Sequence, residues 1–190
     1  MLNKLNTHSL PVTSQEVATA LKKIGWIGFW VQLGLLVVSG GILLVALANP
    51  RLNLNASNSM SELGLFFAVG GLLVLGLSIC WNWRYTYLAQ RLQASNPAIH
   101  PKKSDVIRLL QQGLLVNAVG TLLTLLSVAA SIGTLLAKSL SQVEGLAIDN
   151  ASQLIAPMDM LIVQANINTI IAHFVGIVIA SWLVSRVSYR

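Results

Sequence analysis

Four long apolar runs constrain the fold of this chain more than any other feature of its sequence. They lie at about residues 24–48, 63–83, 109–137 and 159–184, and they are interrupted mainly by Gly, Ser, Thr or an amide side chain. A hydrocarbon layer about 30 Å thick is crossed by roughly 20 helical residues at about 1.5 Å each, and every run is that long. None of the runs alternates apolar and polar residues as a membrane strand would. We therefore expect an all-α membrane protein with four spans packed as two hairpins.

The composition supports this expectation. Only 9% of the 190 residues are charged and 55% are hydrophobic, whereas a soluble domain carries about 25% charged residues. We predict three parts: an amphipathic N-terminal segment at residues 1–23 that lies at the membrane interface, a transmembrane domain at 24–185, and a basic tail at 186–190. We also expect a break at "NPAIHP" before the third span, a short helix in "DNASQLIAP", and a fourth span that begins at Pro157 with Asp159 in its first turn.

The charged residues are distributed unequally between the two sides of the predicted bundle. Ten of the twelve basic residues fall on the side of the termini and the second loop: Lys4, Lys22, Lys23, Arg84, Arg91, Lys102, Lys103, Arg108, Arg186 and Arg190. All five tryptophans are predicted near this same side, where indole rings favour the headgroup boundary. Both termini are therefore expected in the cytoplasm. Because topology explains the net charge of +6, we do not expect nucleic acid as a partner.

Polar side chains recur at helical spacing inside the last two spans. The third span carries Asn117, Thr121, Thr124, Ser127, Ser131, Thr134 and Lys138 along one stripe. The fourth carries Asp159, Asn166 and His173 at intervals of seven, with Gln164 and Asn168 on a neighbouring strip, and the first span adds Gln32. Since hydrocarbon offers these groups no partners, we expect them to face other helices or enclosed water. The candidate polar path or interhelical network comprises Gln32, Asn117, Thr121, Thr124, Ser131, Gln164, Asn166, Asn168 and His173.

Two interpretations of these polar residues remain open. They act as interhelical hydrogen bonds, or they line a solute path. His173 is a functional candidate because an ionisable group inside a span is costly, although a neutral ring bonded to Asn117 or Thr121 explains it equally well. The pairs Gly40-Gly41 and Gly70-Gly71 predict a close crossing of the first two spans. The sequence has no motif of a soluble enzyme, and we expect neither catalysis nor a cofactor.

Three stretches are similar to a known family. "GFWVQL", "GTLLAKSLSQ" and "VQANINTIIAH", within residues 15–185, resemble the cyanobacterial and chloroplast four-span family that includes the chloroplast inner-envelope permease, also described as a component of the inner-envelope protein translocon. The resemblance implies iron uptake or protein import, and many bacterial members are of unknown function. No transit peptide is evident in the first 23 residues, which favours a thylakoid or plasma-membrane protein of a cyanobacterium.

A metal path would be expected to present carboxylate, imidazole or thiolate groups. The candidate metal residues are Asp159 and His173, but they lie 14 residues apart in the sequence, or roughly 20 Å along one helix. Transport would therefore require successive stations or several subunits, and we expect a homo-oligomer or a larger membrane complex in the bilayer. An alternative function is that of a non-transporting accessory or assembly subunit docked on a larger membrane complex, such as a photosynthetic one. The direction of the polar faces distinguishes the two, because a transporter needs them around an aqueous route.

Overall fold

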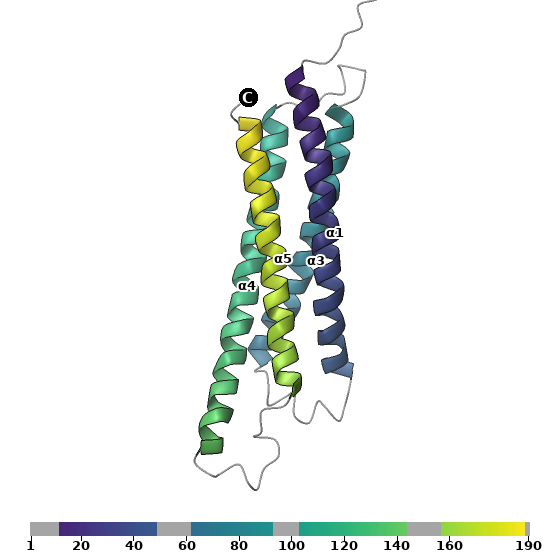
Figure 1. Cartoon of the computed structure of the whole chain (residues 1–190). Coiled ribbons are helices and arrows are strands. Elements are labelled where there is room, and N and C mark those ends of the chain that lie inside the picture. Colours follow the sequence, from purple (N-terminus) through teal and green to yellow (C-terminus); the bar gives the residue numbers. More distant parts are fainter. Residues whose placement is uncertain (1–11, 49–61, 93–102, 144–156, 189–190) are drawn as a thin grey trace, which may run out of the picture.

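The protein is a bundle of four long antiparallel helices, seen in a computed structural model that describes residues 12–48, 62–92, 103–143 and 157–188 (Figure 1). The helices are α1 (Val12–Ala48), α3 (Glu62–Leu92), α4 (Lys103–Val143) and α5 (Pro157–Ser188). No strand occurs in these four ranges. Each helix is long and apolar enough to cross a membrane. The predicted all-α fold with four spans is confirmed.

The helices form a square in which sequence neighbours are also spatial neighbours. The helix α1 packs against α3 and α5, and α4 packs against the same two helices, so α1 and α4 lie diagonally opposite. The beginning of α1, the beginning of α4 and the end of α5 lie at one end of the bundle (Figure 1). We call this the basic end, because it carries Lys22, Lys23, Lys103, Arg108 and Arg186, and we call the opposite end the far end. The predicted pair of hairpins, α1 with α3 and α4 with α5, is present.

The boundaries of the helices follow the proline and charge signals of the sequence. The last helix begins at Pro157 with Asp159 in its first turn, as predicted. The helix α3 ends at Leu92 and α4 begins at Lys103, on either side of the predicted break. The helix α1 is continuous from Val12, so residues 12–23 extend the first span, and Ala18 and Leu21 are buried in the bundle. The interfacial position of the N-terminal segment stays a prediction. Residues 1–11, the last two residues of the basic tail and most of the predicted short helix lie outside the described residues.

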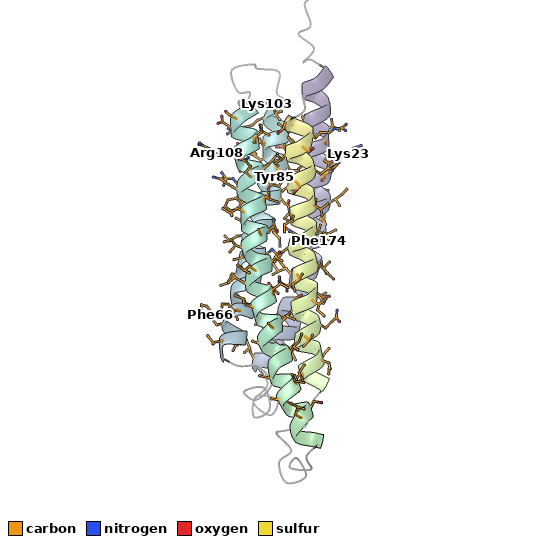
Figure 2. The ribbon with its side chains drawn as sticks, turned by 90° about the vertical axis from the view of Figure 1, so that its left-hand side faces the viewer. Lys23, Phe66, Tyr85, Lys103, Arg108 and Phe174 are labelled. Carbon is orange, nitrogen blue, oxygen red and sulfur yellow. The ribbon has the colours of Figure 1, made fainter. Side chains whose placement is uncertain are left out.

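Two apolar clusters of unequal size fill the bundle. The larger cluster lies at the basic end and joins all four helices through Leu21, Tyr85, Ala89, Val106, Leu110, Ile179, Leu183 and Val187. The smaller one lies at the far end and consists of Leu43, Ala46, Ala68 and Ile162, from α1, α3 and α5. Many large apolar side chains, including the labelled Phe66 and Phe174, point away from the bundle (Figure 2). Such an apolar exterior suits lipid and not water.

The glycine pairs do not bring α1 and α3 together as predicted. A Cβ atom built on Gly40 or Gly41 would meet nothing within 4 Å. Gly70 lies near Leu123, and Gly71 lies against Thr124, so the second pair faces α4. The predicted crossing at these glycines is wrong, because the first pair faces outward and the second is used to approach α4.

Candidate functional site: a buried polar network

The centre of the site is the amide of Gln32, near the middle of α1. Its side chain is fully buried. The amide nitrogen donates to the side-chain oxygen of Asn117 (3.1 Å) and to the backbone oxygen of Ala172 (2.9 Å). The amide oxygen accepts from Asn82 Nδ2 (2.7 Å) and Ser78 Oγ (3.0 Å). Since a primary amide has two donors and two acceptor positions, Gln32 has its full set of hydrogen bonds inside the protein.

Asn117 connects α4 to the other three helices. Its Oδ1 is the acceptor for Gln32 and lies 2.8 Å from the hydroxyl of Ser78, while its Nδ2 donates to the backbone oxygen of Gly113 (2.8 Å). The bond to Gly113 fixes which way the amide points. Because Ser78 has one hydroxyl hydrogen, it donates either to Asn117 or to Gln32 at any moment.

His173 brings α5 into the same network. The ring is fully buried, with Nδ1 3.2 Å from Asn117 Oδ1 and Nε2 3.3 Å from the backbone oxygen of Gly71. Both neighbours are acceptors, and a neutral imidazole has one N–H, so the ring donates to one of them in each tautomer. This agrees with the interpretation of His173 as a ring hydrogen-bonded to Asn117, which was one of the two left open.

Two glycines make room for the polar side chains. A Cβ atom on Gly120 would overlap the ring of His173, and one on Gly176 would overlap the amides of Asn117 and Gln32. Glycine is therefore required at both positions by the close approach of a neighbouring side chain, and not by the backbone angle.

The hydroxyl groups of α4 donate their hydrogen bonds mainly to backbone carbonyls of the same helix. Thr121, Thr124 and Ser131 donate to carbonyls four residues earlier, at 2.8 to 2.9 Å. Thr124 and Ser131 are buried as predicted, and Thr121 is half-buried. Ser127 differs, because it donates to Gly64 of α3 (2.9 Å) and so links two helices. These hydroxyls fill the interface without forming a chain of donors and acceptors across the bundle.

The predicted inward direction is wrong for the pair on the neighbouring strip of α5. Gln164 is exposed and Asn168 is half-buried, and Gln164 Nε2 donates to Asn168 Oδ1 one turn later (3.0 Å). The intrahelical bond satisfies part of each amide, which allows the pair to face outward. Asn166 is buried as predicted, yet its Nδ2 and the hydroxyl of Ser39 have no hydrogen-bond partner among the described residues.

The predicted metal residues occupy different surroundings. Asp159 accepts a 2.9 Å hydrogen bond from Lys138 of α4, and both side chains are buried at the far end. His173 belongs to the central network instead. The described residues contain no group of three His, Cys, Asp or Glu side chains that could hold a metal ion. A metal role for Asp159 and His173 stays a prediction, and the structure does not bring the two together.

Two members of the network, Ser78 and Asn82 of α3, were not among the residues predicted from the sequence. Both are buried and both bond to Gln32. They are four residues apart, as one face of a helix requires, but the intervening Cys80 and Trp81 and the following Trp83 made this segment look uniformly apolar and aromatic. The four-residue spacing of Ser78, Asn82 and Thr86 was the available signal.

Comparisons with known proteins identify the family of this chain. Residues 11–188 match the profile of a family described as "Protein of unknown function (DUF3611)". The chain belongs to this family. It is also 30% identical over 182 residues to the Arabidopsis thaliana protein named "Protein TIC 21, chloroplastic". The predicted relationship to the chloroplast inner-envelope family is confirmed, and this DUF3611 protein is a multi-pass membrane protein.

The matched region covers 92% of this chain and 58% of the Arabidopsis protein, so the DUF3611 chain spans somewhat more than half the length of that relative. No solved structure matches the chain.

Proposed function

We propose that this protein is a packing subunit of a larger membrane assembly and does not by itself form a path for a solute. The observation that carries the proposal is the closed network of Gln32, Ser78, Asn82, Asn117 and His173. The four helices direct these side chains at one another, and each side chain is at most 3% exposed. A solute path would require the same groups around water.

The outward amides of α5 support a contact with another subunit. Gln164 and Asn168 lie five and nine residues beyond Asp159, or about 7 and 13 Å along the helix, a depth at which lipid supplies no hydrogen bonds. Their mutual bond uses one donor and one acceptor, and each amide has further capacity. Because an amide both donates and accepts, the same pair on a second copy is a complementary partner across a two-fold axis.

Translocation of a metal ion or of a protein is the second candidate, and it is supported by the resemblance to the chloroplast inner-envelope permease and translocon family. Four spans whose polar groups bond internally leave little room for a conduit within one copy. A conduit would therefore be enclosed by several copies, or by this chain together with a partner. We also propose that the basic end faces the cytoplasm of a cyanobacterium, in agreement with the excess of Lys and Arg there.

The assembly is tested by replacing both outward amides with Gln164→Leu and Asn168→Leu. We expect the complex extracted in mild detergent to become smaller on native gels or in mass photometry, while the helical content stays unchanged. The matched control is Gln111→Leu with Gln112→Leu, because these two amides are exposed but lie on α4 near the basic end. An unchanged particle size for the α5 variant would reject this contact.

Transport is tested separately with the purified full chain in lipid vesicles. Uptake of Fe²⁺ should not exceed that of protein-free vesicles if the chain is a packing subunit. Uptake that depends on the protein and is lost in both His173→Ala and Asp159→Ala would overturn the proposal and support translocation.

A further inference from the structure

The groove between α1 and α3 at the basic end is lined by a regular set of side chains. Its residues are Thr19, Lys22, Lys23, Trp26, Trp83, Thr86, Tyr87 and Gln90, and its volume is about 600 Å³. Each helix contributes positions i, i+3, i+4 and i+7, which form one face of a helix. Two antiparallel faces therefore build one elongated site that opens on the side of the bundle.

The aromatic side chains of this groove are held in place by their neighbours. Trp26 stacks on Phe29 at 5.6 Å between ring centroids and meets Trp30 edge-on at 5.8 Å. On the opposite wall, Arg91 donates to the hydroxyl of Tyr87 (3.0 Å) and lies over its ring at 4.8 Å. Both walls are thus pre-organised, and preorganisation reduces the entropy cost of binding a ligand.

The charge of the groove is positive. Lys22 and Lys23 line it and Arg91 lies one turn beyond Tyr87. Among the residues that the structure describes, neither lysine forms an ion pair with a carboxylate. Trp26 and Trp83 are 50% and 66% exposed, and exposed indoles favour the headgroup level of a membrane. The cations, the aromatic rings and the position at the headgroup level of the membrane together suit a lipid whose headgroup carries a phosphate or a sulfonate.

We propose that this groove, the α1–α3 headgroup site, binds an anionic membrane lipid. Lys22 and Lys23 neutralise the headgroup, Trp26 and Trp83 bracket its glycerol region, and the acyl chains follow the exposed apolar residues Ile27 and Trp30 along α1. A volume of about 600 Å³ accommodates a headgroup rather than a bare ion. This site is separate from the polar network and does not depend on the proposed function.

The test measures lipid retention by the full chain in neutral detergent with native mass spectrometry. An equimolar mixture of dioleoyl phosphatidylglycerol and dioleoyl phosphatidylcholine offers the same acyl chains with and without a net charge. We expect the anionic lipid to be retained preferentially. Lys22→Gln with Lys23→Gln should reduce this preference by about tenfold to thirtyfold, because each cation near an anionic surface contributes a severalfold factor.

The control is Lys103→Gln with Arg108→Gln, which removes the same charge from the same end. Figure 2 shows Arg108 on the opposite side of the bundle from Lys23, and Lys103 belongs to the same helix, α4, which lies diagonally across from α1. This variant should retain the anionic lipid as the wild type does. Equal losses in the two variants, or no preference in the wild type, would overturn the proposal. Competition by soluble glycerol 3-phosphate at the concentration of the lipid would also overturn it, since the site would then recognise a free anion.

Discussion

The two ends of the bundle differ in how tightly the helices are joined. Towards the basic end, the larger apolar cluster and the polar network connect all four helices, and Gly113, Gly120 and Gly176 lie against neighbouring side chains. Towards the far end, the apolar cluster is small, and Gly40, Gly41 and Gly133 have open space beside them. The polar network of Gln32, Ser78, Asn82, Asn117 and His173 thus adjoins the better-packed end, since its hydrogen bonds require close contact between helices.

The open far half has shallow grooves on both sides of α1. One groove, between α1 and α3, has a volume of about 730 Å³ and is lined by Gly40, Gly41 and Gly76 among apolar residues. Another lies between α1 and Leu161 of α5 and has a volume of about 420 Å³. The polar network residues line neither groove. Cohesion at this end is therefore expected to depend strongly on the ion pair between α4 and α5.

Breaking that ion pair should produce the largest effect. The substitution Lys138→Met leaves the buried carboxylate of Asp159 without this cation, and removing one partner of a buried pair costs about 3 to 5 kcal/mol. We expect a loss of about 3 kcal/mol in the free energy of unfolding, measured by circular dichroism of the purified protein. The double variant Lys138→Met with Asp159→Leu should recover most of this loss. If it does not, the pair is not what holds the far ends of α4 and α5 together.

A smaller effect is expected from Asn117→Leu in the central network. The change removes the acceptor shared by Gln32, Ser78 and His173, and hydrogen bonds between membrane helices contribute about 0.6 to 2 kcal/mol each. We expect a loss of about 2 kcal/mol in the same unfolding measurement. Thr121→Val is the control, because within the described helices the hydroxyl of Thr121 bonds only to a carbonyl of its own helix. Similar losses for the two variants would show that the network adds no cohesion between helices.

Two glycine substitutions compare the packing of the two halves, and the one in the far half should have the smallest effect of all. Gly120→Ala places a methyl group against the ring of His173, and overpacking of this kind costs about 1 to 3 kcal/mol. Gly41→Ala in the open groove should be neutral or stabilise the protein by up to about 1 kcal/mol, because alanine favours the helix. The midpoint of thermal unfolding of each variant is measured, and the difference between the two midpoints reports how differently the two halves of the bundle are packed. Equal destabilisation would indicate that the far half is as tightly packed as the basic half.

The sequence alone determined the number of spans, their approximate ranges and the gathering of basic residues and indoles at one end. These properties follow from the thickness of the hydrocarbon layer and from the chain order, so they need no knowledge of side-chain contacts. It also placed Gln32, Asn117 and His173 among the polar candidates, because charged or amide groups at such depth stand out against apolar neighbours.

The pairing of the polar groups follows only from the packing of the bundle. This packing pairs Gln32 with Ser78 and Asn82, turns Gln164 outward and joins Asp159 to Lys138. Helical spacing gives the face of the helix on which a residue lies. It does not give the rotation of that helix about its axis relative to its neighbours, because this rotation depends on how the side chains of all four helices pack together. For the same reason, a glycine pair in the sequence indicates that a close approach is possible, while the bundle determines whether any helix uses it.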